Sequence, residues 1–194
     1  RYEALALDLN ELVEAPARMY GRTRKDLKIA LHLAPAGAPV RADHTQLEQV
    51  LLNLLLNAGH AMPNGGQVTL TTREVELDAA AVAGHQATPG RYVALIVKDS
   101  GVGMDEATRS RIFEPFFTTR ELGRGSGLGL ASAFGIVKSH EGFITVESQP
   151  GAGATFSIFL PRTDQPLASA SPAAIAVPPG SGETVLLVDD EDLV

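Results

Sequence analysis

The sequence predicts a two-layer α/β (α+β) sandwich, in which a mixed, largely antiparallel sheet is backed by helices on one face. Three observations lead to this fold class. Residues 44–62 carry a strong helical pattern of apolar positions, several other segments alternate apolar and polar residues, and the turn sequence Gln149-Pro150-Gly151 joins two of those segments. Helices combined with hairpin-forming strands are typical of a sheet covered by helices.

Helices are expected in three places along the chain. The first covers residues 8–22, although Pro16 and Gly21 disfavour its interior. The second, over His44–Met62, has the clearest pattern. The third, over Leu128–Ser139, begins directly after a cluster of glycines.

Strands are expected wherever apolar alternation coincides with β-branched and aromatic residues. They are Leu27–Leu33, Val40–Ala42, Gln67–Leu77, Arg91–Lys98, Phe143–Ser148 and Ala154–Leu160. We expect the second of these to pair with the first, and the last two to form a hairpin. An Ala-rich, flexible connection is expected at residues 78–90.

The chain divides into one domain, a linker and the start of another domain. Residues 1–162 contain all the elements named above. Residues 163–182 are rich in Pro, Ala and Ser, a composition typical of a linker because it cannot bury enough apolar surface to fold. Residues 183–194 then begin a new buried-strand pattern, which predicts the first strand of a truncated domain.

Composition and charge exclude several classes of function. The chain carries 16 Lys and Arg against 23 Asp and Glu, and its net charge of −7 argues against broad electrostatic binding of nucleic acid. The absence of cysteine excludes a disulfide scaffold, a thiol nucleophile and a cysteine-ligated zinc site. The sequence contains no run of about 18 apolar residues, so it predicts no membrane-spanning helix.

A polar stripe lies along the helix expected at residues 44–62. Apolar residues at i, i+3, i+4 and i+7 form a core face, and Gln49, Asn53, Asn57 and His60 lie together on the opposite side. One interpretation is a solvated face, although such a face usually carries Glu, Lys or Arg. The other is a site where the carboxamides of Asn53 and Asn57 coordinate a cation such as Mg²⁺ or bind phosphate.

Glycine clusters follow two of the predicted elements. Asp99 ends a buried strand and is followed by Gly101 and Gly103, which suits the floor of a pocket for a flat ligand but also an ordinary turn. In residues 123–130, alternating glycines lead into a helix whose first N–H groups can bind an anion, although a flexible linker has a similar composition. This second cluster matches neither the Walker A loop nor the dinucleotide-binding motif.

Residues 112–120, between the two clusters, are rich in phenylalanine. They predict either a small satellite core or a hydrophobic anchor for a lid that closes over a ligand. A further cluster, Gly151-Ala152-Gly153, is explained by a hairpin turn alone.

Together these motifs resemble the N, G1, F, G2 and G3 boxes of the catalytic, ATP-binding domain of sensor histidine kinases. They occur in the order and approximate spacing of that family, over about residues 8–162. The resemblance implies a Bergerat-type fold, with ATP beneath a mobile lid. The matching motifs are Asn53 with Asn57, Asp99-x-Gly101-x-Gly103, Phe113–Phe117, Gly125-x-Gly127-x-Gly129 and Gly151-x-Gly153-x-Thr155-Phe156.

The resemblance also implies a role for each matching residue. Asp99 is expected to accept a hydrogen bond from the adenine amino group, while Gly101 and Gly103 let the backbone approach the base. Asn53 and Asn57 are expected to hold Mg²⁺ and phosphate oxygens and so to act in catalysis. Arg120 and Arg124 are the candidates to offset phosphate charge. Further nucleotide contacts are expected from Phe117, Gly125, Gly127, Leu128, Gly129 and Thr155.

The implied activity is transfer of the γ-phosphoryl group of Mg-ATP to a histidine, in two-component signal transduction. ATP-hydrolysing relatives of this fold carry a glutamate one turn before the first asparagine, where this sequence has Gln49. That difference favours phosphotransfer, although Glu48 stands beside it. The alternatives are a Bergerat-type ATPase that couples hydrolysis to conformational change, and a non-catalytic nucleotide-binding module.

The acceptor histidine is expected on a dimerisation segment upstream of Arg1, because none of the histidines of this sequence lies in an acceptor motif. The run Val185–Glu191 resembles the first strand and acidic pair of a receiver domain, which implies a hybrid kinase. The expected partners are ATP, the dimerisation segment of a homodimeric parent, and its own or a cognate receiver, without direct contact to nucleic acid. The domain is expected in the cytoplasm, in a parent with or without a membrane anchor. The histidines are His32, His44, His60, His85 and His140.

Overall fold

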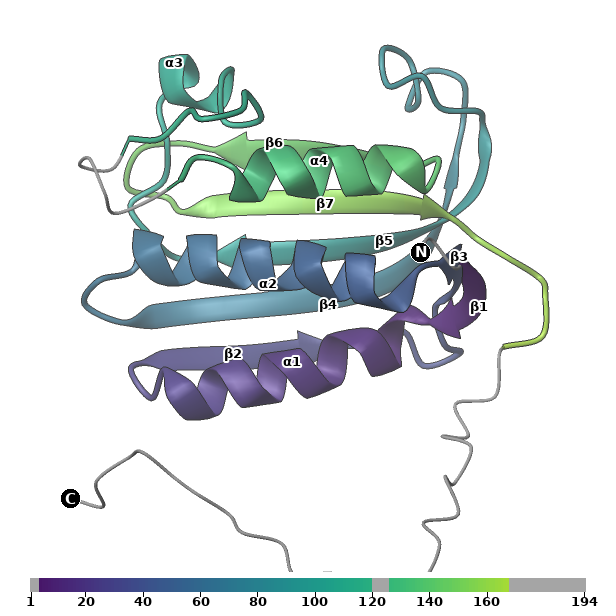
Figure 1. Ribbon diagram of the computed structural model, residues 1–194, viewed down its shortest axis with the longest axis horizontal. Coiled ribbons are helices and arrows are strands. Elements are labelled where there is room, and N and C mark those ends of the chain that lie inside the picture. The colour runs from purple at the N-terminus through teal and green to yellow at the C-terminus, as the bar shows by residue number, and fades with distance from the viewer. Residues whose placement is uncertain (1–3, 120–125, 168–194) are drawn as a thin grey trace, which may run out of the picture.

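A computed structural model describes residues 4–119 and 126–167 of the chain. A five-stranded sheet forms one layer, and the three longer helices lie side by side on one of its faces (Figure 1). The elements in order are β1 (Leu5–Asp8), α1 (Leu9–Thr23), β2 (Leu27–His32), β3 (Pro39–Ala42), α2 (His44–Ala61), β4 (Gly66–Leu77), β5 (Gly90–Asp99), α3 (Glu106–Arg109), α4 (Gly129–Ser139), β6 (Phe143–Ser148) and β7 (Ala154–Pro161).

The main sheet has the strand order β2-β4-β5-β7-β6. β2 runs parallel to β4, and the other neighbouring strands are antiparallel. The sheet is therefore mixed and largely antiparallel, with helices on one face. This confirms the fold class expected from the sequence, including the hairpin of β6 and β7.

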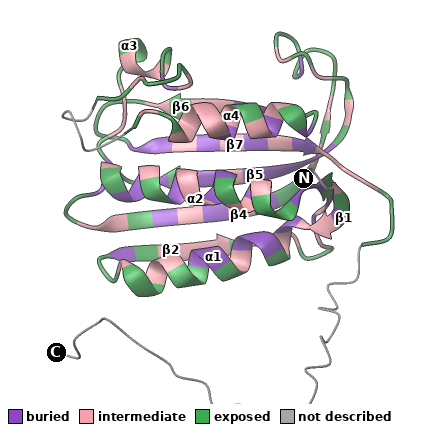
Figure 2. Cartoon of the chain, in the orientation of Figure 1, coloured by how far each residue is buried: buried purple, intermediate pink, exposed green. Residues whose placement is uncertain are grey.

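The main core lies between the helices and the sheet, where Figure 2 shows the buried residues of both layers. Leu51 and Leu55 of α2 are fully buried, as the helical pattern predicted. The Asp43 carboxylate caps the start of this helix by accepting from the Gln46 N–H at 3.1 Å. The Asp43 N–H donates to His140 Nε2 at 3.0 Å, which ties the start of α2 to the end of α4.

The prediction that Val40–Ala42 pairs with the strand at Leu27–Leu33 was wrong. β3 pairs antiparallel with β1, so that Leu5 lies opposite Ala42, and β2 pairs with β4 instead. A strand as short as β1 shows no periodicity that could be read from sequence. It also leads directly into α1, because Asp8 caps that helix by accepting from the Asn10 N–H.

The connection at residues 78–90, which was expected to be flexible, packs against the sheet through two of its side chains. Its turns bury Val82 against Tyr92 and Phe143, and the His85 ring stacks on Phe143 with centroids 4.5 Å apart. This forms a second, smaller core between the connection and the strands β5 and β6. The sequence did not predict this second core, because the apolar residues of the Ala-rich segment do not recur at a helical or strand period.

Candidate functional site

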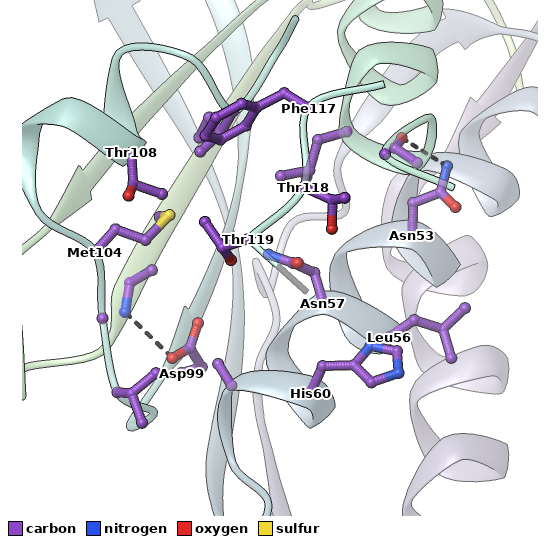
Figure 3. A pocket seen from close by; sticks show the side chains of 18 of the residues that line it. Asn53, Leu56, Asn57, His60, Asp99, Met104, Thr108, Phe117, Thr118 and Thr119 are labelled. Carbon is purple, nitrogen blue, oxygen red and sulfur yellow. Dashed lines mark hydrogen bonds between the residues drawn. The ribbon is translucent and has the colours of Figure 1, made fainter. Parts of the chain in front are cut away.

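A pocket of about 380 Å³ opens where the second half of α2, the end of β5 and the start of α4 meet. This size falls within the usual range of small-molecule sites, roughly 300–1,000 Å³. Figure 3 shows the side chains that surround it, including His60 from the polar stripe of α2. The sequence-predicted residues among its lining are Asn53, Asn57, Asp99, Gly103, Phe117, Gly127 and Gly129.

Asp99 forms the floor of the pocket at the end of β5 (Figure 3). Its side chain is 3% exposed, and Oδ1 accepts from the N–H groups of Gly101 at 2.8 Å and Ala154 at 3.2 Å. Burial raises the pKa of Asp99 above its ordinary value, although these two hydrogen bonds act in the opposite direction. Among the described residues none donates to Oδ2, so this oxygen remains for a donor on a ligand.

Asn53 and Asn57 lie one turn apart on the face of α2 that borders the pocket (Figure 3). The Asn53 amide Nδ2 donates to the carbonyl of Gly129, at the start of α4, at 3.0 Å. This bond fixes the orientation of the amide and leaves Oδ1 to accept from a donor or to coordinate a cation. Asn53, Asn57 and His60 of the polar stripe thus border a pocket.

Gln49 shares this face of α2, one turn before Asn53. Its Nε2 donates to Ser132 Oγ of α4 at 3.4 Å. Neither Gln49 nor Glu48 is among the pocket-lining residues. The residue one turn before Asn53 on this face is thus a glutamine, which cannot act as a base.

The glycines after Asp99 make close contacts within the protein. A Cβ on Gly101 would lie 2.7 Å from Ala61 of α2. Gly103 has a φ of +68°, and a Cβ there would lie 1.9 Å from the carbonyl oxygen of Gln149. Side chains at these positions would push apart the backbone segments that build the pocket wall.

The phenylalanine segment contributes to the main core and the pocket wall and does not form a separate satellite core. Phe113 packs against Phe134 of α4 with centroids 5.2 Å apart, and Phe117 lines the pocket beneath the Arg111 guanidinium, 4.5 Å from its ring centroid. Phe116 is 75% exposed, and its N–H donates to the carbonyl of Gly127 at 3.1 Å. That bond joins the segment to the second glycine cluster.

Several predicted site residues lie elsewhere. Leu128 occupies the position before α4, without a capping side-chain hydrogen bond, and is not among the lining residues. Thr155 pairs with Lys98 and Glu147, and its strand neighbours Ala154 and Phe156 are buried, so it lies on the face of the sheet that the helices leave open. The predictions for Arg120, Arg124 and Gly125 fall outside the described residues.

Other lining residues were missed by sequence reasoning. Val102 and Met104 sit between and after the glycines that follow Asp99, so motif position alone could have marked them. Thr108 belongs to the short α3, which the sequence did not predict. The missed residues are Leu56, Ala61, Val102, Met104, Thr108, Ile112, Thr118, Thr119, Ser126, Leu130 and Ala154.

The described residues limit what else the site can hold. No group of three or more His, Cys, Asp or Glu among them could bind a metal ion. No helix within the described part of the chain has the length and apolar character needed to cross a bilayer.

Comparison with known proteins gives one family. The family described as histidine kinase-, DNA gyrase B- and HSP90-like ATPase matches residues 42–164. The sensor kinase CckA of Brucella abortus (strain 2308) is 43% identical over 187 residues, which cover 92% of this chain and 20% of that protein. Sporulation kinase E of Bacillus subtilis (strain 168) is 35% identical over 154 residues, 79% of this chain and 18% of that protein. The chain thus spans about a fifth of the length of these curated relatives.

Solved structures agree with the sequence comparison. The nucleotide-free catalytic domain of histidine kinase ThkA superposes with a TM-score of 0.68 at 27% identity, covering 83% of this chain and 97% of that domain. Full-length ShkA in complex with AMPPNP gives a TM-score of 0.64 at 28% identity, over 83% of this chain and 31% of that protein. The chain therefore belongs to the histidine kinase-, DNA gyrase B- and HSP90-like ATPase family, as a catalytic, ATP-binding domain of the histidine kinase type.

Proposed function

We propose that this domain binds Mg-ATP beside Asp99 and transfers the γ-phosphoryl group to a histidine on a separate dimerisation segment, in two-component signal transduction. The carboxylate of Asp99 carries the proposal, because Oδ1 is held by two backbone N–H groups while Oδ2 is left for a ligand in the pocket. Such an oxygen suits the adenine amino group, since a charged acceptor forms a strong hydrogen bond in a poorly solvated site. The ShkA complex with the ATP analogue AMPPNP supports the choice of nucleotide.

Asn53 is the residue that we propose for Mg²⁺. Its Nδ2 is engaged by Gly129, which turns Oδ1 into an available hard oxygen ligand. One protein oxygen fits this ion, because Mg²⁺ usually keeps several waters and takes other ligands from substrate phosphates. When bound, the ion neutralises charge on the phosphates. Asn57, one turn further along α2, is placed to contact phosphate oxygens.

Transfer to a protein group is favoured over hydrolysis by Gln49. Activation of a water molecule requires a base near the γ-phosphate. Gln49 occupies the position one turn before Asn53, and no glutamate is among the described residues that line the pocket. Phosphoryl transfer mainly needs positioning and charge neutralisation; the carboxamides of α2 would supply the positioning, and the ion held by Asn53 would supply the neutralisation.

The acceptor and the partners of this domain lie elsewhere in the proposed assembly. His140 is a poor acceptor, because its ring is 4% exposed and both ring nitrogens are hydrogen-bonded, to the Asp43 N–H and the Ile136 carbonyl. We place the acceptor on a dimerisation segment of a homodimeric parent, and residues 163–182 as a linker to a receiver domain that begins near Val185. The length of the relatives supports further domains, and a supply of ATP points to the cytoplasm.

A phosphotransfer assay separates the proposal from its alternatives. The domain is incubated with Mg²⁺ and γ-labelled ATP, together with the histidine-bearing segment of its parent protein. We expect acid-labile label on that segment and little release of phosphate. Rapid phosphate release without label would instead favour an ATPase, and nucleotide binding without either product would favour a non-catalytic module.

A further inference from the structure

We infer that Ser148 is a positioning residue for nucleotide binding, because its hydroxyl joins the two loops that hold Asp99. Ser148 ends β6 and belongs to none of the glycine motifs. Its Oγ accepts from the Met104 N–H at 2.9 Å and donates to the carbonyl of Gly153 at 2.7 Å. The inference rests on the proposed function, since it concerns the adenine end of the same pocket.

The two loops are residues 100–105, after β5, and residues 149–153, between β6 and β7. They meet backbone to backbone: a Cβ on Gly103 would lie 1.9 Å from the Gln149 oxygen, and one on Gly153 would lie 2.1 Å from the Asp99 carbonyl oxygen. The Gly151 N–H donates to the Val102 carbonyl at 2.7 Å. Within the described residues, Ser148 is the one side chain that hydrogen-bonds to both loops.

This contact determines how Asp99 is presented to a ligand. One of the N–H groups on Asp99 Oδ1 comes from the first loop, at Gly101, and the other from Ala154, directly after the second loop. The separation of the loops therefore sets the orientation of the carboxylate. Met104, which donates to Ser148, also lines the pocket. The hydroxyl at position 148 accepts from one loop and donates to the other through a single oxygen atom.

Loss of the Ser148 hydroxyl should weaken the contribution of the adenine base to the affinity for ATP. Without it, the Met104 N–H and the Gly153 carbonyl lose their shared partner, and the carboxylate is no longer held in one orientation. We expect the Kd for ATP to rise about tenfold, the size expected when one or two hydrogen bonds that position a binding group are lost.

The test compares Ser148→Thr with Ser148→Val, two β-branched substitutions that suit a strand and differ mainly in the hydroxyl. Calorimetry measures the Kd of each variant for ATP and for inosine triphosphate (ITP). ITP carries a carbonyl oxygen where ATP has its amino group, so this position of the base cannot donate to Asp99. Ser157→Ala is the matched control, because Ser157 lies on β7 outside the pocket. Thermal unfolding without ligand measures the stability of each variant.

We expect Ser148→Thr and Ser157→Ala to keep the preference for ATP over ITP, and Ser148→Val to reduce it about tenfold. An unchanged ATP affinity in Ser148→Val, or equal losses for ATP and ITP, would overturn the inference, since a purely structural role predicts parallel losses. A folded Ser148→Thr variant without the preference would overturn it as well. If the unmodified domain binds ATP and ITP equally, the adenine role proposed for Asp99 fails first, so the two failures are distinguishable.

Discussion

Replacing Asp99 by asparagine should reverse the base preference of the site and not merely weaken binding. In the native pocket, Oδ1 is fixed by the N–H groups of Gly101 and Ala154 at 2.8 and 3.2 Å. The same two donors select the amide oxygen in Asp99→Asn, because an NH₂ group cannot accept from them. The NH₂ group is then directed toward the ligand in place of the carboxylate Oδ2.

The size of the effect follows from the two changes at the adenine amino group. A hydrogen bond to a charged acceptor is lost, which contributes about 1.5–3 kcal/mol, and a donor now faces a donor, which costs about 1–3 kcal/mol. A combined loss of about 3–5 kcal/mol corresponds to a Kd for ATP raised roughly a few hundredfold to a few thousandfold. ITP presents a carbonyl at this position and should lose little affinity or gain some.

Calorimetric titration of both proteins with ATP and ITP measures this reversal. The variant should be at least as stable as the unmodified domain without ligand, because burial raises the pKa of Asp99 and so disfavours its charge in the folded state. Thermal unfolding checks this point. A loss of ATP affinity below about tenfold, or parallel losses for ATP and ITP, would refute the assignment of Asp99 to the adenine amino group.

Three further predictions concern pH, backbone space and an ion pair. Burial raises the pKa of Asp99, and protonation turns its Oδ2 into a donor. On acidification, the ratio of ATP affinity to ITP affinity should therefore begin to fall at a pH above the ordinary Asp range. A ratio that stays constant down to that range would contradict this prediction. Gly151 and Gly153 share a positive φ (+77° and +74°), but a Cβ meets nothing within 4 Å at Gly151 and lies 2.1 Å from the Asp99 carbonyl oxygen at Gly153. The free energy of unfolding, measured by chemical denaturation, should fall by about 1 kcal/mol in Gly151→Ala and by about 3 kcal/mol or more in Gly153→Ala. Equal losses in the two variants would contradict the close approach of Gly153 to the Asp99 carbonyl oxygen. Glu74 accepts from Arg162 at 2.6 Å and from Arg91 at 3.3 Å, which lowers its pKa, so this pair stabilises the fold above the ordinary Glu range and the contribution disappears as the pH falls through the lowered pKa. Glu74→Gln should therefore lower the free energy of unfolding by about 0.5–1 kcal/mol at pH 7, and this loss should shrink as the pH falls below the ordinary Glu range; a pH-independent loss would exclude the ion pairs as its cause.

Elements with long local patterns could be predicted from the sequence. α2 was expected at His44–Met62 and occupies His44–Ala61, because its leucines repeat at the helical period and a carboxylate caps its start. β1 and the partner of β3 could not be predicted, since strand pairing is non-local and a four-residue strand has no period of its own. The second core around Val82 was missed for the same reason: its partners Tyr92 and Phe143 lie on other strands.

From the sequence, only those site residues could be predicted whose side chains form part of a recognisable motif. Asp99, Asn53 and Asn57 each stand out in the sequence because an unusual polar group sits in an apolar element, and the structure brings all three to one pocket. Thr155 belongs to a motif as well, but strand alternation places it on the other face of the sheet. Ser148 gives no signal in sequence, because a serine at the end of a strand is common and both its partners are backbone groups, one of them, Met104, 44 residues away along the chain.

The structure explains why glycine is required at positions 101 and 103, which the sequence alone did not. From the sequence, Gly101 and Gly103 were expected to let the backbone approach a flat ligand. In the structure, a Cβ on Gly103 would meet the Gln149 carbonyl oxygen, and one on Gly101 would meet Ala61, with no ligand involved. These close approaches bring the N–H groups of Gly101 and Ala154 together on one oxygen of Asp99. The glycines therefore help to orient the Asp99 carboxylate, and a side chain at Gly103 should disturb the pocket even when no ligand is bound.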